Sequence, residues 1–248
     1  MRDYNDIVRR IDVLNRPYIH RRVLGEAKGY PILCLTLSAD DALPTILING
    51  GTHGDEPAGV EATLTFLNQD HTRWLKALRF EAIPCLNPYG YVHNTRHNRQ
   101  GLDINWAFFE RGVPEVESLR RLIDSRKFAG IIDLHEDNES PGYYMYEQRR
   151  GSPGVGRELV RRVSAVCPVN TNSCIEGDPA VAGLIHPDPD AKTALRGNGI
   201  PIVLFQQNTD HYITSETPTE QPIERRIQAH LIALDTMVEY HANPRIGE

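Results

Sequence analysis

The sequence predicts an α/β protein in which helices cover both faces of a mixed, largely parallel sheet. Apolar runs that are typical of strands alternate along the chain with amphipathic stretches that are typical of helices. Several of these runs are apolar throughout, which indicates strands that are buried on both faces, as in parallel sheets. No internal repeat, low-complexity tract or linker interrupts the pattern, so we expect a single domain over residues 1–248.

In the first half of the chain, each expected element has its own signal. Apolar residues recur at helical spacing between Tyr4 and Leu14. Two apolar runs follow, the second ending in Gly50 and Gly51, and both are typical of strands. Asp55 is expected to cap the next helix, whose first turn holds a proline that loses no hydrogen bond there. The expected order is a helix over 4–14, strands over 31–37 and 45–51, helices over 55–67 and 72–78, and a strand over 80–86.

In the second half, a long polar loop follows the Asn-Pro-Tyr-Gly segment at 87–90 before the alternation resumes. The expected elements are helices over 113–126, 155–166 and 220–240, and strands over 128–135, 200–205 and 212–216. Ligands bind outside the carboxyl ends of the strands in sheets of this type. Chemically active side chains at these strand ends are therefore the candidate site residues.

Charge and composition exclude several classes of function. The chain has 27 Lys and Arg against 33 Asp and Glu, a net charge of −6, which argues against a nucleic-acid partner. No run approaches the roughly 18 apolar residues of a membrane span, and the charged opening segment is unlike a signal peptide. We therefore expect a cytoplasmic protein without a membrane partner. The four cysteines, which lack the spacing of a disulfide framework and are expected to be reduced, are Cys34, Cys85, Cys167 and Cys174.

The segment His53-Gly-Asp-Glu56 lies at an expected strand-to-helix turn and is the first candidate site. Its spacing allows an imidazole and a carboxylate to bind one divalent cation, although a solvated turn would have the same pattern. His135 ends another expected central strand, where its side chain can meet this pair. Two histidines and one glutamate form a set of three zinc ligands that leaves a fourth position for water.

The polar loop after residue 90 is the second candidate site. Its Arg96 and Arg99 carry guanidinium groups that can bind carboxylates or a developing oxyanion. Asp103 can accept a hydrogen bond from the outer ring N–H of a metal-bound histidine. A hydrated surface loop is the alternative interpretation.

Four segments of the chain occur in the order of a known family. They are Gly50-Gly-Thr-His53-Gly-Asp-Glu56, Asn87-Pro-Tyr-Gly with Arg96 and Gly-Leu-Asp103-Ile-Asn105, Asp133-Leu-His135, and Tyr212-Ile-Thr-Ser-Glu216-Thr-Pro. Together they resemble the M14 family of zinc carboxypeptidases, the funnelin-type metallopeptidases, and especially its compact bacterial members. Four ordered segments are much more specific than any one of them.

This resemblance implies a mechanism with one zinc ion. The implied zinc ligands are His53, Glu56 and His135. By the same resemblance, Asp103 would support His53 and Arg96 would polarise the scissile carbonyl. Glu216 would activate the zinc-bound water as general base and then protonate the leaving amine. Without the resemblance, Glu216 would be interpreted as a turn residue at a strand end.

Substrate binding is the point at which the sequence departs from the family. Asn105 matches the family motif, but Trp106 follows it where the family has an arginine that grips the terminal carboxylate. An indole offers one N–H donor and a large apolar face in place of that bidentate clamp. We expect Trp106 and Arg99 to contribute to substrate binding. More distant arginines that could replace the clamp are Arg149, Arg150 and Arg196.

The segment from Glu136 to Tyr146 is acidic and then aromatic. Its carboxylates would favour a basic substrate side chain if they lined the pocket. The alternation of Tyr144 and Tyr146 is also expected for one face of a strand, and we favour this structural interpretation.

The leading functional hypothesis is a zinc-dependent hydrolase that cleaves an amide bond in small peptides, as a carboxypeptidase-like exopeptidase. The alternative is an N-acyl amino acid deacylase that resembles aspartoacylase and succinylglutamate desuccinylase, which share the His-x-x-Glu start. A third hypothesis is a non-catalytic metal-binding module, which the presence of Glu216 disfavours. The expected partner is therefore a small peptide or an acyl-amino acid, and the sequence predicts no oligomeric state.

Overall fold

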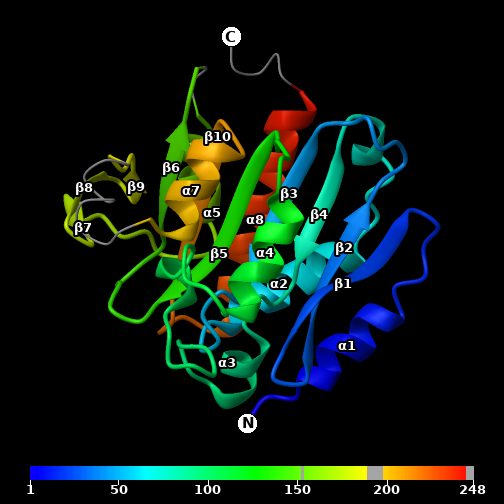
Figure 1. The fold of residues 1–248 in the computed structure, drawn as a ribbon. Helices are drawn as coiled ribbons and strands as arrows, with labels where there is room; N and C mark the ends of the chain where they lie inside the picture. The colour runs from blue at the N-terminus through cyan, green and yellow to red at the C-terminus, as the bar shows by residue number, and fades with distance from the viewer. Residues whose placement is uncertain (152–153, 189–197, 244–248) are drawn as a thin grey trace.

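The computed structural model describes residues 1–151, 154–188 and 198–243. In this part of the chain ten strands form a mixed sheet with helices on both faces (Figure 1), which confirms the predicted fold class. The strands are β1 (Ile19–Ala27), β2 (Tyr30–Leu37), β3 (Thr45–Gly50), β4 (Arg79–Ile83), β5 (Gly130–Asp137), β6 (Tyr144–Arg149), β7 (Cys174–Ile175), β8 (Asp178–Val181), β9 (Leu184–Ile185) and β10 (His211–Pro218). The helices are α1 (Tyr4–Asp12), α2 (Pro57–Asn68), α3 (Pro88–His93), α4 (Pro114–Ile123), α5 (Gly156–Val163), α7 (Ile200–Gln207) and α8 (Ile223–Ala242), with 3-10 turns η1 (Trp74–Lys76) and η2 (Ile104–Trp106).

The centre of the sheet is parallel and its flanks are antiparallel. Strands β4, β3, β5 and β10 lie side by side and run in the same direction. Strand β2 pairs with β4, and β6 pairs with β10, in the antiparallel sense. The full strand order is β1-β2-β4-β3-β5-β10-β6-β9-β8-β7.

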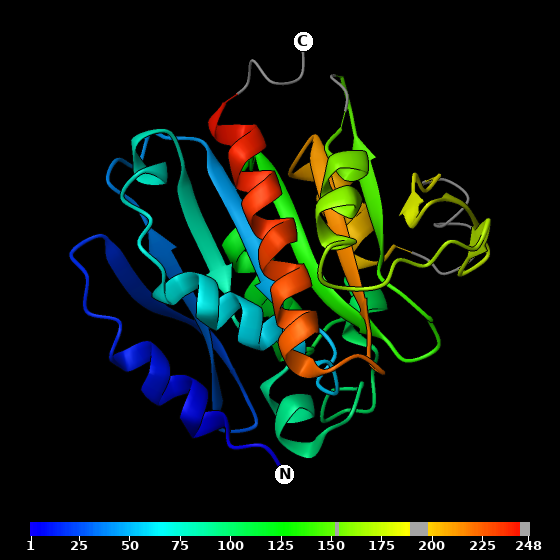
Figure 2. The ribbon, with the colours of Figure 1, turned by 180° about the vertical axis from the view of Figure 1, so that it is seen from behind.

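The core lies in two layers, one on each side of the sheet. Helices α2, α5 and α8 cover one face (Figure 2), whereas α4 and α7 cover the other (Figure 1). Successive residues of β3 show how one strand serves both layers, because Ile46 and Ile48 join the first apolar cluster while Leu47 joins the second. Every residue of β3 is buried, which explains its uninterrupted apolar run.

The segment 200–205, predicted as a strand, is instead part of helix α7. Gly199 precedes the helix in an extended conformation, and Pro201 lies in the first turn, where its missing N–H costs no hydrogen bond. Five of the eight helix residues are buried, in an unbroken apolar run without helical periodicity. The sequence pattern was therefore indistinguishable from that of a buried strand.

Two smaller predictions are also wrong, and one short helix was not predicted. Within residues 72–78 only the short turn η1 forms, at Trp74–Lys76. Asn87 caps the unpredicted helix α3 by accepting a hydrogen bond from the Gly90 amide at 2.9 Å. Asp55 does not cap α2. Glu56 occupies the cap position without a capping bond, because its carboxylate points toward two histidines instead.

Three strands bring the candidate residues to one edge of the sheet. Strand β3 ends at Gly50, just before the loop that carries His53 and Glu56. On β5 and β10, His135 and Glu216 are register partners. The adjacency of β3, β5 and β10 therefore places residues from distant parts of the chain around a common point.

Two further observations concern the chain as a whole. Among the described residues, no helix combines the length and the apolar character needed to cross a membrane. All four cysteines are free thiols, of which Cys174 is exposed and the others are buried.

Candidate metal centre

The loop between β3 and α2 carries two of the three candidate ligands. Gly54, next to His53, lies so close to α3 that a Cβ atom there would be 1.9 Å from the carbonyl carbon of Gly90. A Cβ on Gly90 would in turn lie 2.5 Å from the Asn87 amide nitrogen. Arg2 donates a hydrogen bond to the Gly54 carbonyl at 2.7 Å. Contact between two residues without side chains thus fixes the loop against α3.

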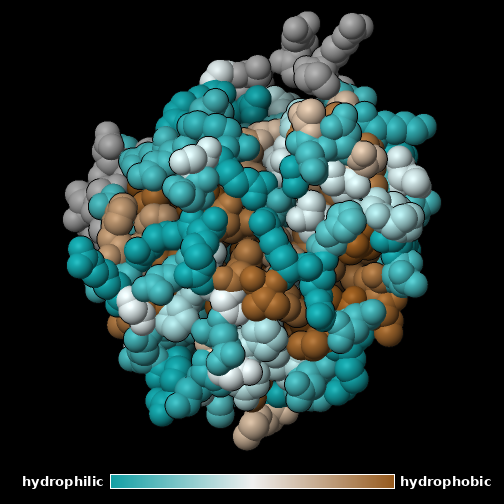
Figure 3. Space-filling view, turned by 45° about the vertical axis from the view of Figure 1, so that its right-hand side comes forward, coloured by the Kyte–Doolittle hydropathy of each residue, from teal (hydrophilic) through white to brown (hydrophobic). Residues whose placement is uncertain are grey.

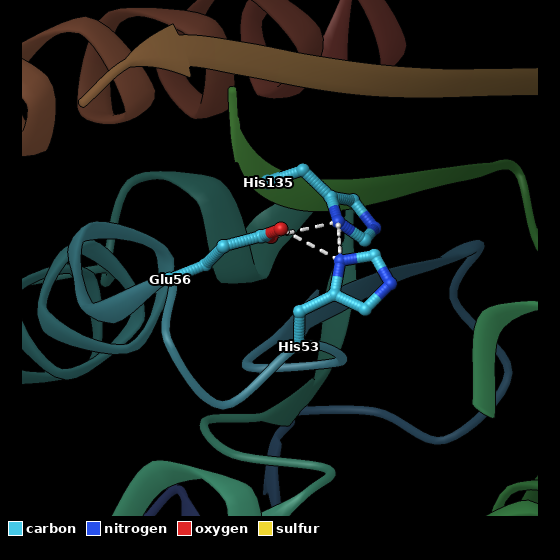
Figure 4. A group of neighbouring side chains, drawn as sticks. All are labelled: His53, Glu56 and His135. Carbon is cyan, nitrogen blue, oxygen red and sulfur yellow. Dashed lines mark hydrogen bonds and ion pairs between the residues drawn. The ribbon is translucent and has the colours of Figure 1, made fainter. Parts of the chain in front are cut away.

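The three candidate ligands converge on one buried point (Figure 4). The Nδ1 atom of His53 lies 2.7 Å from one carboxylate oxygen of Glu56, and the Nδ1 atom of His135 lies 2.9 Å from the other. The two Nδ1 atoms are 3.2 Å apart. All three residues are at most 5% exposed, and their donor atoms lie within 4.8 Å of one another. Two imidazole nitrogens and a carboxylate oxygen are the donor set that zinc prefers, so these residues fit a divalent cation.

The outer nitrogen of each histidine faces an aspartate. His53 Nε2 lies 3.0 Å from Asp103 Oδ1, and His135 Nε2 lies 3.3 Å from Asp133 Oδ2. This arrangement directs both Nδ1 atoms toward Glu56. The contact of His53 with Asp103 is a hydrogen bond, whereas that of His135 with Asp133 is an ion pair without hydrogen-bond geometry. A carboxylate hydrogen-bonded to the outer nitrogen of a histidine fixes its ring and tautomer and strengthens it as a metal ligand. Asp103 thus lies behind His53, and its support of a metal ligand stays a prediction.

Asp133 is a site residue to which the sequence analysis assigned no role. Its other contacts hold it in place, because it accepts hydrogen bonds from the Asn49 amide at 2.9 Å and from the Tyr212 hydroxyl at 3.2 Å. The available signal was the spacing Asp133-Leu-His135, since residues i and i+2 of a strand point to the same face.

The electrostatics of the cluster favour a positive charge at its centre. Burial alone would raise the pKa of Glu56, but His53 and His135 outweigh it and hold that pKa well below its usual range. Burial alone would lower the pKa of both histidines, but the surrounding carboxylates raise both values. Carboxylates that outweigh burial in this way also favour a bound divalent cation.

Arg96 lies beside this cluster at the edge of the cavity. Its Nε and Nη2 atoms are each 3.0 Å from Asp103 Oδ2, and its Nη1 atom is 3.5 Å from Glu56 Oε1. The side chain is 43% exposed, so part of the guanidinium remains open to a ligand. This position suits the predicted role in polarising a substrate carbonyl.

Glu216 lines the same cavity from β10. Burial raises its pKa to about 8, and the carboxylates of Glu56 and Asp137 act in the same direction. A carboxylate in the same cavity as a metal site is in a position to accept and return a proton. The cavity has a volume of about 330 Å³, and the three candidate ligands also line it.

The predicted substrate-binding residues separate into two groups. Asn105 and Trp106 line the cavity. The Trp106 ring rests against the backbone of Gly199, where an added Cβ would lie 2.5 Å from it. Arg99 is exposed, lies over the Tyr89 ring at 5.6 Å and is absent from the described cavity wall, so the structure does not bring it to the site.

None of the more distant arginines considered as replacements for the clamp lines the described part of the cavity. Arg149 lies over the Tyr240 ring, and Arg150 lies over the Phe205 ring. Arg196 is outside the described residues.

The acidic segment after His135 contributes both to the fold and to the cavity wall, which Glu136, Asp137 and Glu139 line. Glu136 caps α2 by accepting a hydrogen bond from the Ala58 amide at 2.6 Å, and it forms an ion pair with Arg226. Tyr144 and Tyr146 stand on one face of β6, as the strand interpretation predicts. Tyr146 also lines the cavity, so the same strand contributes to the pocket wall.

The fold and the buried His-Glu-His set together define a metallopeptidase-like protein with the architecture of the zinc carboxypeptidases. Comparison with solved structures confirms the resemblance inferred from the sequence. A candidate metallopeptidase from Shewanella amazonensis is 26% identical, over 95% of this chain and 91% of that one, with a TM-score of 0.79. Another from Shewanella baltica is 25% identical, over 96% and 92% of the two chains, with a TM-score of 0.82.

A metallo-carboxypeptidase from Burkholderia cenocepacia shares the fold at greater sequence distance. It is 18% identical, over 97% of this chain and 68% of that one, with a TM-score of 0.68. No family model and no curated protein matches the sequence.

Proposed function

We propose that the protein is a zinc-dependent amide hydrolase that cleaves small peptides, with the chemistry of a carboxypeptidase-like exopeptidase. The observation that carries this proposal is the convergence of His53, Glu56 and His135 in the cavity that Glu216 also lines. The likeness to candidate metallopeptidases over nearly the whole chain supports it.

The residues around the cavity have complementary roles in such a reaction. Zinc in a site of this kind supplies Lewis-acid chemistry and makes water acidic enough to lose a proton near neutral pH. Glu216, which lines the same cavity as the candidate ligands, accepts the proton of the attacking water and returns it to the leaving amine. Arg96 donates hydrogen bonds to the carbonyl oxygen as negative charge develops on it. Asp103 keeps this guanidinium in position through contacts of 3.0 Å.

The described cavity wall offers no free arginine to bind a terminal carboxylate of the substrate. Its single arginine, Arg96, is already in contact with Asp103 and Glu56, and Trp106 stands where the family has its carboxylate clamp. We therefore propose amide hydrolysis without requiring a free terminal carboxylate. Deacylation of N-acyl amino acids is a variant of the same chemistry.

Metal content and one substitution test the catalytic proposal. We expect about one zinc ion per purified chain. We expect Glu216→Gln to lower kcat by roughly 10²–10⁴-fold, the usual contribution of a general base, without loss of zinc. Glu220→Gln is the matched control, because Glu220 is exposed and is not among the described cavity residues. A zinc-free protein, or an unchanged rate in Glu216→Gln, would exclude the proposed mechanism.

A substrate panel tests the bond that is cleaved. Peptides with a free carboxyl end, the same peptides as carboxyl amides, and N-acyl amino acids should be compared by kcat/KM. Equal cleavage of acids and amides is expected if no terminal clamp operates. A strong preference for N-acyl amino acids would instead assign the protein as a deacylase.

A further inference from the structure

His230 is a polar side chain in the apolar layer between the sheet and helix α8. It is completely buried, and most of the other buried residues of this helix are apolar. Its Nδ1 atom lies 3.0 Å from the Ser215 hydroxyl, and its Nε2 atom lies 3.2 Å from the Thr217 hydroxyl. Both hydroxyls belong to β10, against which α8 packs on the face seen in Figure 2. One imidazole ring thus joins the helix to two points of the strand.

The hydrogen-bonding capacity of this ring is fully used. Burial lowers the pKa of His230, so the ring is neutral near pH 7 and has one N–H donor and one acceptor nitrogen. One of the two hydroxyls therefore donates to the ring and the other accepts from it. The Ser215 hydroxyl has a second partner, the Tyr143 hydroxyl at 3.0 Å. A fully paired polar network is directional and rigid, whereas apolar packing has no preferred direction.

The two bonded hydroxyls flank the proposed general base. Ser215, Glu216 and Thr217 are consecutive residues of β10, so the first and the last point toward α8 while Glu216 points to the opposite face. On that face Glu216 lines the cavity, and it is the register partner of His135 on β5. The position of its carboxylate relative to this candidate ligand therefore depends on where the backbone of β10 lies. His230 holds that backbone from behind, on both sides of Glu216.

We infer that His230 is a positioning residue for the proposed reaction, because its bonds to Ser215 and Thr217 fix Glu216 relative to the candidate metal ligands. This inference rests on the proposed function, since it concerns the general base of the same site. Reacting groups must be held to within about 0.5 Å, and a misplacement of about 1 Å can lower a rate about 100-fold. A contact that only stabilised the fold would change the free energy of unfolding but not the rate of the folded protein.

Crystal structures of zinc-loaded variants test the position of Glu216 without depending on turnover. Thr217→Val keeps the shape of the side chain but removes its hydroxyl, and His230→Leu removes both bonds of the ring. We expect each change to displace the Glu216 carboxylate by about 0.5 Å or more relative to His135. Thr217→Ser, which keeps the hydroxyl, should restore the wild-type position. Thr217→Val alone provides the test if His230→Leu does not fold.

The kinetics of the zinc-saturated proteins provide the second readout, measured with the peptide of the substrate panel that has the highest kcat/KM. We expect His230→Leu and Thr217→Val each to lower kcat by about tenfold or more, with KM within about twofold of the wild-type value. The double variant should lose little more than His230→Leu alone, since both changes break the same contact. Thr217→Ser should recover most of the rate.

Thr236→Val is the matched control. Thr236 is a buried residue of the same helix, and its hydroxyl donates to the Ile232 carbonyl at 2.7 Å. Its removal should lower the free energy of unfolding, as the loss of a buried hydrogen bond does, at an unchanged kcat.

The outcomes distinguish the two proposals. A Glu216 carboxylate that stays within about 0.5 Å of its wild-type position in both His230→Leu and Thr217→Val would overturn the assignment of His230. An unchanged kcat in both variants, when Glu216→Gln is impaired, would also overturn it. A wild-type rate in Glu216→Gln together with a displaced carboxylate in Thr217→Val would refute the proposed function and leave the contact of His230 with β10 as the determinant of the Glu216 position.

Discussion

Replacing Gly54 by alanine should disable metal binding without touching a ligand. Ordinary contact begins at 3.4 Å, and the new Cβ would lie 1.9 Å from the Gly90 carbonyl carbon, so the loop and α3 must separate by roughly 1.5 Å. The atoms that resist this movement are backbone atoms, which cannot turn aside as a side chain can. Metal sites tolerate displacements of only about 0.2 Å. Because His53 precedes Gly54 and Glu56 follows two residues later, both ligands would move.

We expect Gly54→Ala to weaken zinc binding by at least about 100-fold, or about 2.7 kcal/mol. Overpacking should also lower the free energy of unfolding by about 1–3 kcal/mol. Zinc affinity is measured by competition with a chromophoric chelator, and stability by urea denaturation of the zinc-free protein. Gly29→Ala is the control, since Gly29 has a φ of +87° and open space around its Cβ position. It should lose about 1 kcal/mol of stability at unchanged zinc affinity. Full zinc affinity in Gly54→Ala would show that the loop adapts and that the Gly54–Gly90 contact does not position the ligands.

Three further predictions concern other parts of the structure. Asp133→Asn removes the carboxylate 3.3 Å from His135 Nε2 and should weaken zinc binding by about 10–100-fold in the same chelator assay; unchanged affinity would contradict the role given to Asp133. Trp106→Arg should raise the ratio of kcat/KM for free-carboxyl over amidated peptides by about tenfold, and an unchanged ratio would mean that this position does not contact the substrate terminus. Burial lowers the pKa of His230 to about 3, below the unfolded value of 6.5, so the unfolded state binds more protons between these values. The free energy of unfolding should therefore fall below about pH 6.5, by up to about 1.4 kcal/mol per pH unit, and His230→Asn should flatten this slope in urea titrations; an equal slope in both proteins would exclude His230 as its source.

A helix or strand could be predicted where the burial of its residues gives the sequence an apolar periodicity or an apolar run with clear ends. Strands β3 and β5 have every or nearly every residue buried and appear as apolar runs with clear ends. Helix α7 was predicted as a strand, because its unbroken apolar run is equally compatible with a strand. Pro201, which follows Gly199 by two residues, was a usable signal for the start of a helix. Strand β1 was not predicted, because most of its residues are exposed at the edge of the sheet and its sequence therefore has no apolar alternation.

The candidate metal ligands were predictable because their spacing in the sequence reflects local geometry at strand ends. The contacts that support them were not, because they depend on register and approach distance between separate elements. The Gly54–Gly90 contact joins a loop to a helix that the sequence did not reveal. The placement of Tyr146 in the cavity wall depends on the pairing of β6 with β10, which no local pattern specifies. Arg99 was predicted as a substrate-binding residue because it is close to the motif in the sequence, but its guanidinium lies outside the described cavity wall.

Strand β10 is the last strand to be synthesised, yet it lies inside the sheet. Strands β5 and β6 follow each other along the chain, yet β10 lies between them in the sheet and carries Glu216. On the face of the folded protein shown in Figure 3, hydrophilic side chains surround patches of hydrophobic ones. Before β10 is inserted, the facing edges of β5 and β6 present unpaired backbone groups. All three candidate metal ligands leave the ribosome before the proposed general base does. A growing chain can thus bring the three candidate metal ligands together early, while the proposed hydrolysis must wait for the last strand to be inserted.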